Sequence, residues 1–581
     1  MHSFSSLARG LTRRRFVTSL GAGACLSALP QQAKAEGRPS SGCLPAMPSN
    51  TWDLKVSRTH VSLDGKSMHA PSIGGSIPGP ILRWKQGETV TLNVRNTLDE
   101  TTSIHWHGIR VPADMDGVPG LSFAGIPPGE TFTYRFRLHQ SGTYWYHSHS
   151  NMQEAMGLYG AIVIDPIRPD PNACDRDYVI FLGEWTDVMP HDIVNNLKMQ
   201  DDYYVFRQRT AASFPKEARE AGSAMAALKD RLAWSRMNMA ATDIADVSGI
   251  IYTYTLNGHA PDMNWNGLFR PGERVRLRFI NGATMTLFDV RIPGLEMLVV
   301  QADGNDVEPV PVDEFRIGVA ETYDVIVQPK EDRAYTIFAQ SEDRTGFARG
   351  TLAPHAGMRG LIPPMDPRPV RTMVDMGMGN MKPGESMDHM SMPGMDMSHM
   401  GHMAMPKIEV DDPGPPPINV ENQNVAMMPM DRTGSPGDGL EDNGRRVLTY
   451  KQLRATRPGA DPRPPSREII LHLTGNMERY IWGFNGRKFS ESGPIKLKKG
   501  ERVRFTLIND TMMEHPIHLH GLWSELENGQ GDYRPYKHTI ISQPGSRMSY
   551  LVTADVPGMW AYHCHLLYHM DLGMFRTVVV S

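Results

Sequence analysis

Paired histidines most strongly limit what this chain can fold into and bind. Four His-x-His pairs occur, where random placement would give about one. Successive side chains of a strand point to opposite faces, so each pair places two imidazoles on one side of a sheet. The pairs are His105–Trp106–His107, His147–Ser148–His149, His518–Leu519–His520 and His563–Cys564–His565. Imidazoles with one thiolate among them predict a metal centre built on strands.

A strand pattern repeated three times divides the chain. Gly-Glu is followed by alternating residues and by an Asn nine positions after the Gly, at 87–96, 272–281 and 500–509. Alternation predicts half-buried strands, and repeated strands with Gly and Pro turns predict β-sandwiches. We expect an all-β protein with domain 1 at 45–168, domain 2 at 175–350 and domain 3 at 445–581.

The repeat also aligns the histidines. His105 and His107 follow Asn96 at the offsets at which His518 and His520 follow Asn509, whereas the same offsets in domain 2 give apolar residues. A second alignment matches 142–157 with 558–573. Domain 1 therefore has the paired histidines but lacks four residues that only domain 3 carries. At the positions of His515, Cys564, His569 and Met574, it has Thr102, Ser148, Gln153 and Leu158.

The four residues unique to domain 3 predict a mononuclear copper site. Two imidazoles, a thiolate and a weak thioether describe a blue-copper electron-transfer centre. Zinc is the rival metal, but a thioether is a poor ligand for it. Cys564, His569 and Met574 lie within eleven consecutive residues, which places the last two on the loop after the strand of the cysteine.

The eight paired histidines predict a second, larger site. Four come from domain 1 and four from domain 3, so pairing these domains would bring them together. Eight imidazoles suit three ions, two with three ligands and one with two, and leave coordination positions open for dioxygen or water. Cys564 lies between His563 and His565, which gives a short covalent path for electrons from one site to the other. The alternative is a structural or storage cluster, which needs no such path.

These motifs closely resemble the four signatures of multicopper oxidases. The resemblance implies cupredoxin-like Greek-key domains, one type 1, one type 2 and two type 3 copper ions, and reduction of dioxygen to water. It implies that His105 and His518 hold the type 2 ion. It assigns one type 3 ion to His107, His147 and His565, and the other to His149, His520 and His563. A nitrite reductase is disfavoured, since that family needs a single type 2 ion.

Asp116 matches the family position of an acid that delivers protons to the cluster. An ordinary Asp-Gly turn is an equal alternative, because Gly117 follows. Some relatives carry a second acid directly after the last histidine ligand, where this chain has Met570.

The N-terminus predicts export to the periplasm. Residues 12–17 resemble a twin-arginine signal, and an apolar run and a small-x-small cleavage site ending at Ala35 follow. We expect 1–35 to be a signal peptide read by the twin-arginine machinery, with no stable membrane insertion. An oxidising compartment permits a disulfide between Cys43 and Cys174, with two unpaired thiols as the alternative.

A methionine-rich tract precedes domain 3. Residues 373–405 hold twelve methionines in a Gly/Pro-rich background, within a low-complexity segment at 351–444. A loose linker is one interpretation, and capture of additional labile Cu(I) by soft thioethers is the one we favour. The candidate ligands are Met387, His389, Met390, Met392, Met395, Met397, His399, Met400, His402 and Met403.

The tract and the signal resemble the copper-resistance protein A branch of the family. This resemblance implies an oxidase of Cu(I), and of phenols too, with copper-handling proteins as partners. Two alternatives stay open: a copper-sequestering binding protein and a laccase-like phenol oxidase. The net charge of −4 does not favour nucleic acid as a partner. Residues 213–233 predict a helix packed on domain 2 through Ala221, Met225, Leu228 and Leu232.

Overall fold

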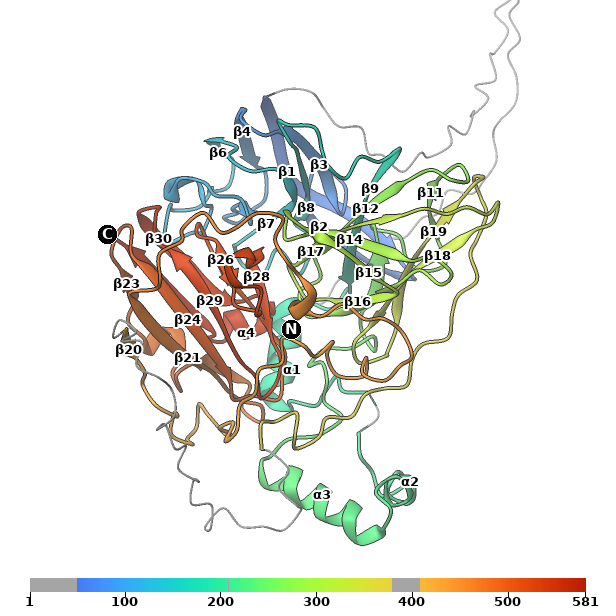
Figure 1. Cartoon of the computed structure of the whole chain (residues 1–581), viewed down its shortest axis with the longest axis vertical. Coiled ribbons are helices and arrows are strands. Elements are labelled where there is room, and N and C mark those ends of the chain that lie inside the picture. Colours follow the sequence, from blue (N-terminus) through green and yellow to red (C-terminus); the bar gives the residue numbers. More distant parts are fainter. Residues whose placement is uncertain (1–49, 207, 379–407) are drawn as a thin grey trace, which may run out of the picture. The chain divides into compact units, whose positions relative to one another are not determined.

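The repeated strands form six β-sheets, two in each of three domains, in a computed structural model that describes residues 50–206, 208–378 and 408–581 (Figure 1). The all-β architecture is confirmed. The sheets of domain 1 have the strand orders β2-β1-β4-β6 and β3-β8-β7-β5. Their strands are β1 (Thr51–Leu63), β2 (Lys66–Ile73), β3 (Gly79–Lys85), β4 (Thr89–Asn96), β5 (His105–His107), β6 (Thr131–Arg137), β7 (Gly142–His147) and β8 (Tyr159–Asp165).

Domain 2 has the sheet orders β10-β9-β12-β17-β14-β15 and β11-β19-β18-β13-β16. Its strands are β9 (Arg176–Trp185), β10 (Thr253–Leu256), β11 (Trp265–Leu268), β12 (Val275–Asn281), β13 (Phe288–Arg291), β14 (Met297–Ala302), β15 (Asn305–Val312), β16 (Glu314–Ile317), β17 (Thr322–Val327), β18 (Tyr335–Ser341) and β19 (Phe347–Ala353).

Domain 3 has the orders β20-β21-β24-β29-β26-β27, with β22 also paired to β21, and β23-β31-β30-β25-β28. Its strands are β20 (Glu409–Asp411), β21 (Arg467–Asn476), β22 (Ile481–Phe484), β23 (Ile495–Leu497), β24 (Arg502–Asn509), β25 (His515–Leu519), β26 (Ser524–Leu526), β27 (Tyr536–Lys537), β28 (Thr539–Ser542), β29 (Arg547–Thr553), β30 (Gly558–Cys564) and β31 (Phe575–Val580).

The repeated asparagine ends the same strand in each domain and ties down the loop after it. Asn96, Asn281 and Asn509 are the last residues of β4, β12 and β24, and all three are buried. Each side-chain amide donates to two main-chain carbonyls, and each side-chain oxygen accepts from the main-chain NH two residues later. These bonds satisfy buried backbone groups where the chain crosses between sheets, which gives the repeat a structural reason.

The helical insertion differs from the prediction. Helices α2 (Phe214–Glu220) and α3 (Ala224–Arg236) replace one long helix, because Gly222 adopts φ +75° and Ser223 caps α3. The expected packing is wrong: Leu228 and Leu232 are exposed, as is Met225, and α2 and α3 lie apart from the sheets (Figure 1). The other helices are α1 (Pro190–Met199) and the one-turn α4 (Leu567–Asp571). In the described part of the chain, no helix is long and apolar enough to cross a membrane.

The ends of the predicted low-complexity segment pack on the domains. Residues 354–378 contribute the buried Arg371 and Met376, and β20 extends a sheet of domain 3 by parallel pairing with β21. Residues 379–407, which include every candidate Cu(I) ligand of the methionine tract, lie outside the described residues. Its Cu(I) ligands therefore remain a prediction.

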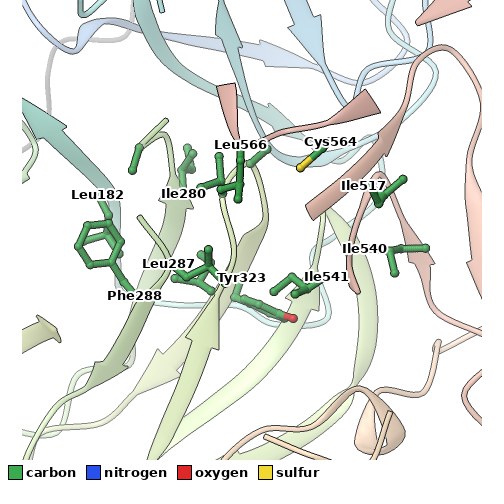
Figure 2. Close-up of a cluster of buried hydrophobic side chains, with 14 of the residues drawn as sticks. Leu182, Ile280, Leu287, Phe288, Tyr323, Ile517, Ile540, Ile541, Cys564 and Leu566 are labelled. Carbon is green, nitrogen blue, oxygen red and sulfur yellow. The ribbon is translucent and has the colours of Figure 1, made fainter. Parts of the chain in front are cut away.

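Domains 2 and 3 share one buried apolar cluster. Figure 2 shows Leu287 and Tyr323 of domain 2 in the same cluster as Ile541 and Cys564 of domain 3. A buried ion group joins the two domains: Nζ of Lys537 lies 3.1 Å from Oδ2 of Asp303 and 2.9 Å from Oε1 of Glu321. Asp303 Oδ2 also accepts from the main-chain NH groups of His538 and Thr539, so domain 2 fixes the turn between β27 and β28.

Candidate metal centre

The ends of β25 and β30 and the helix α4 bring the mononuclear set together. Cys564 Sγ lies 3.5 Å from His515 Nδ1 and 3.9 Å from His569 Nδ1, and the two nitrogens are 3.2 Å apart. Met574, the fourth predicted ligand, is buried and adjoins them, since its main-chain NH donates to His569 and its carbonyl accepts from Cys564. Three convergent donor atoms are what a single ion needs.

Partners outside the cluster hold the other ring nitrogens of these imidazoles. His515 Nε2 lies 2.7 Å from Thr511 Oγ1, and His569 Nε2 lies 2.6 Å from Asp246 Oδ2. The indole of Trp482 stacks on His569 with ring centroids 3.7 Å apart. Burial lowers the pKa of His515 far below its usual value and raises that of the Cys564 thiol. The imidazole is thus neutral and ready to bind, while metal binding must displace the thiol proton.

The eight paired histidines converge between domains 1 and 3. Main-chain pairing sets them opposite one another, with His105 facing His147 across β5 and β7, and His518 facing His563 across β25 and β30. Potential ligand atoms lie within 4.8 Å of one another in the groups His107–His147–His565, His149–His520–His563 and His105–His107–His518. The structure therefore brings together the sets that the resemblance implies.

Six of the eight paired histidines have a buried ring nitrogen with no hydrogen-bond partner among the described residues. A buried ring nitrogen without a partner costs free energy, which a bound cation removes. These orphaned atoms are His105 Nε2, His107 Nδ1, His147 Nε2, His149 Nε2, His518 Nε2 and His565 Nε2. The remaining two, His520 Nε2 and His563 Nε2, face each other at 3.0 Å. The donor set fits copper.

Acceptors on the protein hold the opposite ring nitrogens. Nδ1 of His105 donates to the carbonyl of Asp116, Nδ1 of His518 to that of His538, and Nδ1 of His563 to that of Cys564. Each bond selects the tautomer that turns an unprotonated nitrogen toward the cluster. Burial also lowers the pKa of His563 to about 3, so its imidazole is neutral.

Asp116 is buried against the cluster rather than in an open turn. Its Oδ2 accepts from Nδ1 of His520 at 2.8 Å, and its Oδ1 lies 3.4 Å from Nδ1 of His105. The carboxylate thus touches one ligand candidate from domain 3 and one from domain 1. Gly117 does adopt φ +84°, and a Cβ there would meet the carbonyl of Ile104 at 1.9 Å, so the turn itself requires glycine.

The sequence analysis missed three buried residues at the centre. Asp246 comes from domain 2, and its contact with His569 spans 323 positions. His538 belongs to no pair, yet its Nδ1 lies 3.1 Å from Nε2 of His107. Glu154 lies 2.7 Å from Nδ1 of His147. For Glu154 alone there was a signal: the alignment of the two outer domains pairs Gln153 with His569, and Glu154 is the next residue.

Two predictions fall outside the described residues. The signal peptide at 1–35 and Cys43 lie in the part of the chain that the structure does not describe. The Cys43–Cys174 disulfide therefore stays a prediction. Cys174 is described, and it is partly exposed.

Comparisons with known proteins agree with this geometry. Family models described as multicopper oxidase match residues 55–169, 176–355 and 462–581. The chain is 53% identical to copper resistance protein A of Escherichia coli, over 91% of this chain and 92% of that protein. It is 53% identical to a copper resistance protein A homolog of Pseudomonas syringae pv. tomato, over 98% and 99% of the two chains.

Solved structures share the fold at low sequence identity. Fet3p, described as a multicopper oxidase that functions in iron import, has a TM-score of 0.63 at 19% identity and covers 91% of this chain and 90% of its own. The multi-copper oxidase from Pseudomonas thermotolerans has a TM-score of 0.57 at 21% identity, over 91% and 99% of the chains. With three matching family models and relatives at half identity over nearly its full length, this chain belongs to the multicopper oxidase family.

Proposed function

We propose that this oxidase protects the periplasm from copper by oxidising Cu(I) and reducing dioxygen to water. The observation that carries the proposal is the single strand β30, which ends in Cys564 at the mononuclear set while His563 and His565 flank it at the eight-histidine cluster. The 53% identical relatives are named for copper resistance. Four copper ions in these sites would supply one-electron oxidation and dioxygen reduction.

The chain's own residues would hold four ions in two places. His515, Cys564, His569 and Met574 would hold the type 1 ion, and the eight paired histidines the other three. Trp482 and Asp246 keep His569 in one orientation. Asp116 orients His520, and delivery of protons from it remains a prediction. The mononuclear set is shielded from water, since Cys564 and Met574 are fully buried.

Acidic residues of domain 2 favour a cation as the reductant. Asp246 contacts His569, and Asp243 is buried beside it. Burial and the negative charges of Asp246, Asp201 and Asp202 raise the pKa of Asp243 well above its usual value. One oxygen of Asp243 and one of Asp246 have no hydrogen-bond partner among the described residues. A monovalent cation would relieve this repulsion, whereas a neutral phenol would not.

We expect Asp246→Asn to lower kcat/KM for Cu(I) by about 10–100-fold, because the variant loses both the carboxylate partner of His569 and a negative charge that attracts the cation. A phenol should lose less, since the change affects it only through the contact with His569. Oxygen uptake with each substrate measures both values, and Asp187→Asn, at an exposed acid of the same domain, is the control. Equal losses for the two substrates would contradict a cation route through Asp246.

Described residues on both sides of the methionine tract are bonded to the rest of the protein. On its N-terminal side, Gly377 accepts from the main-chain NH of Met428. On its C-terminal side, Asn424 and Ala426 bond to Asp510, the residue before the Thr511 that holds His515. We propose that the tract collects Cu(I) and releases it beside this loop.

Deletion of 379–407 should raise the KM for Cu(I) several-fold and leave phenol oxidation unchanged. The deletion begins after 378 because Met376 is buried and belongs to the folded core. Replacing the nine methionines of 379–407 by leucine is the matched control, since it keeps the length and removes only sulfur. If cells lose copper tolerance while the purified oxidase is unchanged with Cu(I), sequestration is the main role.

A further inference from the structure

A second buried carboxylate, that of Glu154, contacts histidines of both outer domains, as Asp116 does. Oε2 of Glu154 lies 2.7 Å from Nδ1 of His147 in domain 1, and Oε1 lies 3.8 Å from Nδ1 of His565 in domain 3. Asp116 likewise spans His105 of domain 1 and His520 of domain 3. The side chain of Glu154 is 97% buried, and its Oε1 has no hydrogen-bond partner among the described residues.

The duplication explains where this acid lies. The alignment of 142–157 with 558–573 pairs Glu154 with Met570, the position at which some relatives carry an acid. In this chain the acid is absent from domain 3 and present at the equivalent position of domain 1.

A rigid turn holds Glu154 in place. Gln153 accepts from Thr102 Oγ1 and Ser148 Oγ, and its amide donates to the carbonyl of Thr101. Met152 has φ +56°, and Gly157 closes the turn by donating to the carbonyl of Glu154. Glu154 therefore meets His147 without freedom to swing away, which an outer-sphere partner requires.

We propose that Glu154 is a positioning residue for the group His107–His147–His565. Its carboxylate holds the proton of His147 on Nδ1, so that Nε2 faces the cluster unprotonated. It also places one negative charge beside His565, which ties the domain 3 ligand to domain 1. Among the described residues, the carbonyl of Ser148, 3.1 Å from the same Nδ1, is the only other acceptor near this nitrogen, and it is neutral. This inference rests on copper binding at the eight histidines.

Comparing copper retention in two variants of Glu154 separates the effect of its negative charge from that of its hydrogen bond. Glu154→Leu should weaken copper retention by the eight-histidine cluster by about 10–100-fold in competition with a chelator. Glu154→Gln should lose less, because its amide oxygen still accepts from Nδ1 of His147. The electron paramagnetic resonance signals of the cluster should change in both variants, while the blue absorption of the mononuclear site stays unchanged and serves as the internal reference. The control is Glu130→Gln, at an exposed acid of domain 1.

A Glu154→Leu protein with the retention and spectrum of the control would overturn the inference and leave the proposed function intact. Wild-type protein that takes up no copper at the eight histidines would instead overturn the proposed function. The unfolding midpoints of the metal-free variants show whether each one folds. If the leucine variant does not fold, the nearly isosteric glutamine variant decides, and unchanged retention and signals in it would count against Glu154.

Discussion

Cys564→Ser is expected to lower Cu(I)-driven oxygen uptake by at least about 100-fold, beyond the usual effect of an outer-sphere change. The thiol sulfur lies 3.5 Å from His515 Nδ1 and 3.9 Å from His569 Nδ1. A hydroxyl is a far weaker ligand for copper than a thiolate. The substitution also cuts the covalent link between the mononuclear set and His563 and His565, so electrons taken from Cu(I) could not reach the cluster.

The same variant gives a spectroscopic check. The blue colour of the copper-loaded protein should vanish, whereas copper at the eight histidines should remain, because none of their contacts involves Sγ. Metal analysis and absorption measure both quantities. Cys174→Ser is the control, since it makes the same substitution at a partly exposed cysteine outside both ligand sets. Steady oxygen uptake that survived in Cys564→Ser would contradict the assignment of this cysteine.

Lys537→Met is expected to lower the free energy of unfolding by about 3–5 kcal/mol, the usual cost of removing one partner from a buried ion group. Lys537 is fully buried and would leave Asp303 and Glu321 without their counter-ion. Burial alone would lower the pKa of Lys537, but attraction to the two carboxylates raises it above its usual value. Its contribution is therefore present below the unfolded pKa of about 10.4 and is lost as pH rises through the folded one.

Denaturant unfolding of the metal-free protein measures this loss. Lys498→Met, at an exposed lysine of domain 3, should change stability by less than about 0.5 kcal/mol. Because Asp303 also holds the main-chain NH groups of His538 and Thr539, we expect the variant to loosen the junction of domains 2 and 3 first. A loss no larger than that of the control would show that the ion group contributes nothing net.

The sheets and the ligand groups could be predicted because both follow from short-range periodicity. The repeated pattern located β12 and β24, although both strands are buried on both faces rather than half-buried as expected. One residue between histidines was enough to place two imidazoles on one face. The prediction of one helix packed on domain 2 was wrong. The helical spacing of Met225, Leu228 and Leu232 does not reveal whether another element covers these side chains. In the structure none does, and Gly222 divides the helix.

The partners around the ligands could not be predicted, because they depend on tertiary contacts. Asp246 and His569 lie in different domains, and no local pattern relates them. Asp116 was found through family resemblance, although the sequence alone favoured a plain turn equally. The alignment of 142–157 with 558–573 could have identified Glu154, because it pairs this residue with Met570, directly after the ligand His569. The residues that contact the ligands depend on how the chain packs in three dimensions, so the sequence pattern of a single strand does not predict them.

The asparagine ties have a consequence for how the protein matures. Asn281 secures its loop in domain 2, where Val290 and Ile292 occupy the ligand positions, with the same pattern of bonds as Asn96 and Asn509. The asparagine bonds that hold the loop before each ligand-bearing strand therefore do not require metal. Zinc fingers, by contrast, are unfolded without their metal. We therefore expect this protein to fold before it binds copper and to stay folded when the copper is removed.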